Sequence, residues 1–132
     1  MGVEGYLISS SLLAIQAQRL VRRVCSHCAE TRPLNEDEAT VLEINANACP
    51  EIRRGKGCER CGQTGYRGRV GLYELLMMSD AIRHHIASGS DANIIRDEAK
   101  KEGMRTLRED AIDKLNAGLT TPEEIARVTS CL

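Results

Sequence analysis

The sequence predicts an α+β fold built around an aliphatic core, with one segment held together by a metal ion. Two Cys-x-x-Cys pairs, Cys25–Cys28 and Cys58–Cys61, enclose a 29-residue spacer. An apolar run bounded by turn residues follows Gly68, and capped helical segments occupy the remainder. The chain has 132 residues, three Tyr and no Trp or Phe. Its core must therefore be aliphatic, and a chain this poor in aromatic residues gains from a metal crosslink.

The N-terminal part predicts one helix. Ser9–Ser11 offers N-caps to a helix from about Leu12 to Val24, with Leu12, Ile15, Leu20 and Val24 roughly on one face. Its apolar stretch is broken by glutamines and is too short and too polar for a membrane span or a signal peptide.

A short helix and a loop are predicted between the cysteine pairs. Asn35 is a candidate N-cap, and the three acidic residues after it favour the positive end of a helix dipole, so we expect a helix to about Ile44. Residues 45–57 contain Pro50 and two glycines, and these features predict a loop that returns to the second pair.

The last part predicts one strand followed by an array of short helices. The run from Arg69 to Met78 is apolar and predicts the strand. Caps and glycines then predict four helices: from Asp80 to near Gly89, from Ser90 or Asp91 to Gly103, from Thr106 to Gly118, and from Thr121 onward with Pro122 at its first position.

The two cysteine pairs predict a structural Zn²⁺ site. Four thiolates at this spacing can close a tetrahedral shell around one ion. Such a shell has no open position for water, and two pairs at ligand spacing fit one metal better than two redox sites. The expected ligands are Cys25, Cys28, Cys58 and Cys61. Loss of the metal is expected to unfold the segment from about Val24 to Arg69.

Other residues with reactive side chains have simpler explanations. His27 is an alternative metal ligand but is better explained as a solvated turn residue, and Cys49 and Cys131 are expected to be spectator thiols. His84 and His85 point about 100° apart on a helix and cannot easily share an ion. The acidic pairs Glu109-Asp110 and Glu123-Glu124 fall in first helical turns, where capping explains them. We therefore expect no catalytic residue.

Charge is unevenly distributed along the chain. The net charge is −1, yet ten Lys or Arg residues lie from Arg19 to Arg69. Five of these arginines have two alternative explanations. They bind a phosphate or an acidic partner, or they form a solvated basic face. They are Arg19, Arg22, Arg23, Arg67 and Arg69. Two Cys-x-x-Cys pairs in a sequence without a signal peptide favour reduced thiols in the cytoplasm.

A set of short segments spread over essentially the whole sequence shares one resemblance. The segments are Met1–Glu4, Ser9–Leu13, Ala17–Arg22, the four-cysteine pattern, Thr64–Leu76, Gly103–Asp110, Gly118–Ile125 and Arg127–Thr129. Together they resemble the ATPase family that drives type II secretion and type IV pilus assembly. The four cysteines fit the secretion and pilus-extension branches and argue against the retraction branch.

This resemblance implies three segments and a role in a larger machine. Residues 1–24 would end a RecA-like core, residues 25–68 would form the zinc subdomain, and residues 69–132 would be a strand with a helical subdomain. The parent would be a cytoplasmic hexamer that hydrolyses ATP with Mg²⁺ and drives an inner-membrane platform. Arg67 and Arg69 would lie near a subunit contact or the nucleotide.

The phosphate-binding loop of that family has no counterpart in this sequence, which contains no Gly-x-x-x-x-Gly-Lys-Ser/Thr run. We therefore expect a fragment of a longer protein that is structural or coupling in role and does not hydrolyse ATP alone.

Two other functions are compatible with parts of the sequence. A free-standing zinc ribbon that binds nucleic acid or protein would use the arginines, but only Tyr66 offers a stacking platform near the second pair, so no direct nucleic-acid partner is expected. The run after Cys58 also approaches the knuckle repeat of Hsp40 co-chaperones, with Gln63 where that repeat has Gly. Neither alternative explains the Gly65–Arg69 run or the helical tail.

Overall fold

The computed structural model describes residues 2 and 4–129, and these form two compact units. Unit 1 combines Met1–Ala17 with Tyr73–Thr106, and unit 2 combines Gln18–Leu72 with Leu107–Leu132. Both helices and strands are present, so the predicted α+β class is confirmed. None of the helices in the described residues is long and apolar enough to span a bilayer. The proposed division at residues 24 and 68 stays a prediction.

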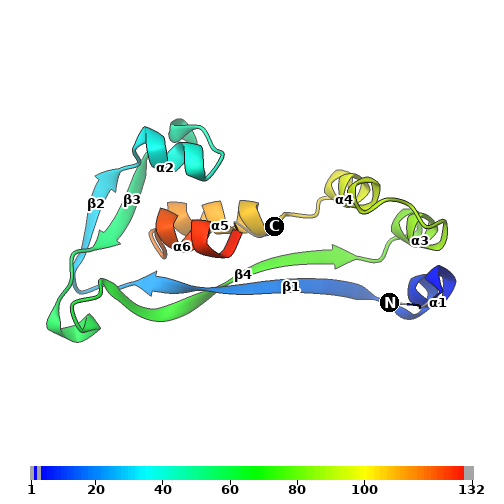
Figure 1. Cartoon of the computed structure of the whole chain (residues 1–132), viewed down its shortest axis with the longest axis horizontal. Helices are drawn as coiled ribbons and strands as arrows, with labels where there is room; N and C mark the ends of the chain where they lie inside the picture. The colour runs from blue at the N-terminus through cyan, green and yellow to red at the C-terminus, as the bar shows by residue number, and fades with distance from the viewer. Residues whose placement is uncertain (1, 3, 130–132) are drawn as a thin grey trace. The chain divides into compact units, whose positions relative to one another are not determined.

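Unit 1 is held by a small aliphatic cluster between three helices, α1 (Gly5–Ser11), α3 (Asp80–Ala87) and α4 (Ala92–Lys101). Figure 1 shows α1 and α3 side by side. Their backbones approach so closely that a Cβ on Gly5 would lie 2.7 Å from the carbonyl oxygen of Ile86. The cluster consists of Met78, Ile82 and Ala99, with Leu12, Leu76, Ile86, Ile95 and Met104 against it.

Residues 14–24 form a strand, so the helix predicted there is wrong. Strand β1 (Ala14–Val24) pairs with β4 (Tyr66–Met77), and the two arrows run in opposite directions in Figure 1. The proposed apolar face leaves four positions between Ile15 and Leu20, and a step of five residues does not return to the same face at a 3.6-residue period. Pairing with β4, the strand predicted over residues 69–78, supplies the backbone hydrogen bonds that decide the conformation.

Unit 2 contains a second antiparallel pair, β2 (Ala29–Pro33) and β3 (Glu51–Gly55), which joins Ala29 to Gly55 and Pro33 to Glu51. The prediction of a loop over residues 45–57 is therefore wrong for β3. Only Ile52 of β3 is buried, so its sequence lacks the apolar alternation of a half-buried strand. In Figure 1 the β2–β3 ribbon runs from α2 (Glu36–Val41) to the turn that holds the second cysteine pair.

The helices of unit 2 start at the predicted caps, although α2 ends at Val41, short of the predicted Ile44. The side chain of Asn35 accepts from the Glu38 N–H, and the Glu38 carboxylate accepts from the Asn35 N–H, which starts α2. Helices α5 (Leu107–Asn116) and α6 (Pro122–Thr129) begin directly after the predicted caps Thr106 and Thr121.

The core of unit 2 is aliphatic, as the composition predicts. It joins β1, the β2–β3 segment, α5 and α6, and each fully buried Leu or Ile contributes about 1.5–3 kcal/mol. Its members are Val21, Leu34, Ala39, Leu42, Cys49, Ile52, Leu72, Leu107, Ala111, Leu115 and Ile125. The cysteine pairs lie outside this cluster, so a different interaction must hold them.

Candidate metal centre

The four cysteines of the two pairs meet in space. Their Sγ atoms all lie within 4.8 Å of one another. The Cys25–Cys58 and Cys28–Cys61 sulfur pairs are each 3.8 Å apart, and the Cys58–Cys61 pair is 3.7 Å apart. Disulfide sulfurs are only about 2.05 Å apart. All four are therefore free thiols arranged around a common centre.

The spacing of the sulfurs fits a zinc ion. A Zn–S bond of about 2.3 Å places the corners of a regular tetrahedron about 3.8 Å apart. The distances of 3.7 and 3.8 Å between Sγ atoms match that edge. A set of four soft sulfur donors selects Zn²⁺ over Mg²⁺ or Ca²⁺, which prefer oxygen ligands. The site can hold one structural Zn²⁺.

Backbone turns aim the sulfurs of the second pair inward. Residues Glu59–Cys61 form a 3₁₀ turn that Gly62 ends in the left-handed region, with φ at 64°. The N–H groups of Cys58 and Gly65 then donate to the Cys61 Sγ at 3.3 and 3.2 Å. These donors stabilise a thiolate, which is the form that binds a metal.

The thiols differ in how readily they ionise. Burial alone would raise the pKa of Cys61, but the hydrogen bonds from the Cys58 and Gly65 N–H groups lower the pKa to about 6. Burial raises the pKa of Cys28 to about 11, with the neighbouring thiols acting in the same direction. Four thiolates this close repel one another, so a bound cation is required for all of them to be ionised.

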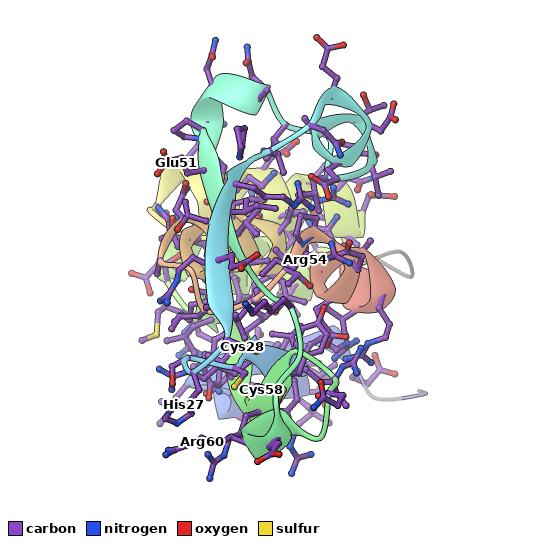
Figure 2. The ribbon with its side chains drawn as sticks, turned by 90° about the vertical axis from the view of Figure 1, so that its left-hand side faces the viewer. His27, Cys28, Glu51, Arg54, Cys58 and Arg60 are labelled. Atoms are coloured by element: carbon purple, nitrogen blue, oxygen red, sulfur yellow. The ribbon has the colours of Figure 1, made fainter. Side chains whose placement is uncertain are left out.

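The cluster lies at one end of unit 2, where its packing partners are other cysteines. Cys25, Cys28 and Cys61 are buried and Cys58 packs against them at intermediate exposure. Figure 2 shows Cys28 and Cys58 side by side below the β2–β3 ribbon, with His27 and Arg60 beyond them. A metal would supply the cohesion that aliphatic side chains give elsewhere.

The backbones of Gly55 and Gly65 approach each other closely next to the second cysteine pair. The Gly65 carbonyl accepts from the Cys25 N–H at 2.9 Å, so Gly65 touches both halves of the cluster. A Cβ on Gly65 would lie 2.4 Å from the Gly55 carbonyl oxygen, and one on Gly55 would lie 2.2 Å from the Gly65 oxygen. Any side chain at either position would push β3 away from the metal-binding turn.

Gly65→Ala is accordingly expected to destabilise the chain more than Gly68→Ala. Both glycines have φ at +82°, but a Cβ on Gly68 meets nothing within 4 Å. The alanine at residue 68 therefore bears only the backbone penalty, about 1 kcal/mol, whereas Gly65→Ala adds about 1–2 kcal/mol of steric overlap. Urea unfolding of the zinc-loaded variants measures the difference. Equal midpoints for the two would contradict the crossing of the backbones.

The remaining candidate residues lie outside the cluster. His27 is exposed, with its Nε2 3.3 Å from the Arg60 guanidinium. Cys49 lies in the aliphatic core of unit 2, where its thiol donates to the Glu51 carbonyl oxygen, and Cys131 is outside the described residues. His84 and His85 lie on α3 in unit 1.

The predicted basic residues do not act as one group. Arg67 and Arg69 are exposed on β4, and neither forms an ion pair with the residues that the structure describes. Arg22, by contrast, is engaged: its backbone N–H and its Nε donate to the two carboxylate oxygens of Glu124 at 2.7 and 2.9 Å. This contact was not predicted, because its partners lie 102 residues apart in the sequence.

Comparisons with known proteins cover nearly the whole chain. A family model described as "Type II/IV secretion system protein" matches residues 1–127. The chain is 45% identical over 130 residues to the "Type IV pilus assembly ATPase PilB" of Thermus thermophilus, covering 95% of this chain and 14% of that protein. It is 44% identical over 133 residues to the "Type II secretion system protein E" of Aeromonas hydrophila, covering 98% and 26% of the two. It is 41% identical over 129 residues to the "Type II secretion system protein E" of Pseudomonas aeruginosa, covering 98% of this chain and 26% of that protein.

Proposed function

The chain belongs to the type II/IV secretion system protein family, and we propose that it is the C-terminal module of a secretion or pilus-assembly ATPase. The observation that carries the proposal is a sequence identity of 40–45%, along nearly the whole chain, to proteins named as type II secretion system protein E or type IV pilus assembly ATPase. The chain spans about a quarter or less of the length of the curated relatives cited above. The ATP chemistry, with its Mg²⁺, belongs in this proposal to the longer protein.

The proposed module contains one structural metal ion. Cys25, Cys28, Cys58 and Cys61 bind one structural Zn²⁺, supported by sulfur distances that match a ZnS₄ tetrahedron. Zinc bound there ties the turn after β1 to the turn before β4. Residues 25–68 then form a subdomain in which the metal holds the two cysteine turns and Leu34, Leu42 and Ile52 anchor the remainder to the aliphatic core.

The longer protein of this proposal is a hexameric ATPase. Residues 1–24 complete a RecA-like core, and residues 69–132 carry the helical subdomain. Six copies form a ring in the cytoplasm, which acts on an inner-membrane platform and so lies at the membrane through its partners. The exposed arginines Arg67 and Arg69 contact a neighbouring subunit or approach its nucleotide, because they carry charge that no described acidic residue neutralises.

The isolated chain is expected to release no phosphate from Mg-ATP above the buffer rate, because its role is structural and coupling. A chimaera that carries this chain in place of the matching region of the Aeromonas hydrophila protein is expected to hydrolyse ATP. Colorimetric phosphate release measures both proteins under the same conditions. Turnover that follows the pure isolated chain through purification, or an inactive but folded chimaera, would overturn the proposed role.

A further inference from the structure

We propose that a cluster of five side chains is a latch that makes the docking of α6 depend on the metal. The latch consists of Arg22, Tyr66, Thr121, Glu124 and Arg127. All five belong to unit 2, and they connect the strand after the second cysteine pair with the start of α6. The inference rests on the proposed binding of Zn²⁺ by the four cysteines.

The first step runs from the metal ligands to Tyr66. The Gly65 N–H donates to the Cys61 Sγ at 3.2 Å. The Thr64 hydroxyl donates to the Cys61 carbonyl at 2.7 Å and accepts from the Tyr66 N–H at 3.1 Å. The backbone immediately before Tyr66 is therefore positioned by a metal ligand.

The second step runs from Tyr66 to the cap of α6. The Tyr66 hydroxyl and the Thr121 hydroxyl share a hydrogen bond of 2.7 Å. The Tyr66 ring also lies under the Arg22 guanidinium, 4.1 Å from its centroid, at cation–π distance. One side chain thus fixes both the N-cap of α6 and the arginine that pairs with it.

The third step lies inside α6. The Glu124 side chain is 2% exposed and accepts from Arg22 and from the Arg127 guanidinium, the latter at 2.9 Å. The Thr121 hydroxyl accepts from the Glu124 N–H at 3.4 Å. A carboxylate this deeply buried needs those donors, so displacement of Arg22 would favour exposure of Glu124 and undocking of the helix.

Helix α6 contributes less than α5 to the aliphatic core of unit 2. Within the described residues, α6 adds Ile125 to that core, with Val128 packed against it, whereas α5 adds three buried side chains. The other buried residues of α6 are Pro122, Glu124 and Thr129, and Glu124 is held by the latch. An eight-residue helix is too short to persist in water by itself. Loss of the metal should therefore release α6 before α5.

Hydrogen exchange of the full chain tests the latch. With zinc bound, the amides of residues 125–129 should be protected, and removal of zinc by a chelator should speed their exchange about tenfold. The α5 amides should change by less than twofold. In Tyr66→Phe, which keeps the ring but loses the hydroxyl, the α6 amides should already exchange faster with zinc bound. The control is Tyr6→Phe, since Tyr6 lies exposed on α1 in unit 1.

The outcomes separate the latch from the metal site. Zinc bound at one ion per chain with unchanged α6 exchange after chelation would overturn the latch and leave the metal site intact. Equal acceleration in α5 and α6 would also overturn it, because unit 2 would then open as a whole. A chain that binds no zinc would overturn the proposed site itself.

Discussion

Replacing Cys58 and Cys61 together with serine is expected to abolish zinc binding and to disorder both cysteine turns. Serine hydroxyls are poor zinc ligands, and two remaining thiolates cannot complete a tetrahedral shell. Structural zinc contributes about 10–16 kcal/mol of apparent binding energy in zinc-finger peptides, and that energy is folding energy for the segment it holds. Metal analysis of the purified chain and limited proteolysis between residues 25 and 66 measure the two effects.

The matched control removes a cysteine outside the cluster. Cys49→Ala should keep one zinc per chain, because Cys49 lies in the aliphatic core and not among the four sulfurs. It should lower stability only by the loss of one buried thiol, about 1 kcal/mol. Unchanged zinc content in the double serine variant would contradict the four-sulfur assignment.

The structure narrows how much of the chain should depend on the metal. The sequence alone led us to expect unfolding from about Val24 to Arg69. Leu34, Leu42 and Ile52 from that segment lie in the same aliphatic cluster as Leu115 of α5. The β2–β3 ribbon and α2 therefore have apolar anchors of their own, and within residues 24–69 the expected disorder is confined to the two cysteine turns.

The sequence revealed the features that depend on short spacings. The cysteine pairs, the cap at Asn35 and the start of α6 at Pro122 each follow from residues within a few positions of one another. Conformations decided by distant partners were missed. Residues 14–24 became a strand because β4, more than 40 residues later, pairs with them. A single sequence contains no local pattern that reports such a partner.

The crossing of Gly55 and Gly65 shows the same limit on a smaller scale. In the sequence either glycine is typical of a turn. A φ of +82° accounts for the glycine at residue 65 but not for the one at residue 55. Their need for each other appears only when β3 lies against the metal-binding turn. Glu124 was likewise explained by its place in a first helical turn, although its burial and its two arginine partners define its role.

Glu124→Gln is expected to destabilise the chain by about 2–3 kcal/mol at neutral pH. Removing one partner of a buried ion pair costs about 3–5 kcal/mol, and the half-exposed arginines reduce that figure. Their side chains are 54% and 56% exposed, against 2% for Glu124. The control is Glu123→Gln, whose carboxylate is 49% exposed and pairs with Arg54, so its loss should cost less than about 1 kcal/mol.

The pH dependence of this difference identifies the ionised carboxylate as its cause. Burial alone would raise the pKa of Glu124, but hydrogen bonds from Arg127 and Arg22 lower it below its ordinary value. A depressed folded-state pKa gives stability that is present above the unfolded pKa, about 4.3, and is lost as the pH falls through the folded pKa. The gap between wild type and Glu124→Gln in urea unfolding should therefore be constant from pH 8 to 6 and shrink below about pH 4.3. Zinc content is measured in both proteins at each pH, because loss of zinc would itself loosen α6 and narrow the gap. A gap that persists undiminished in acid would show that shape, and not charge, makes Glu124 necessary.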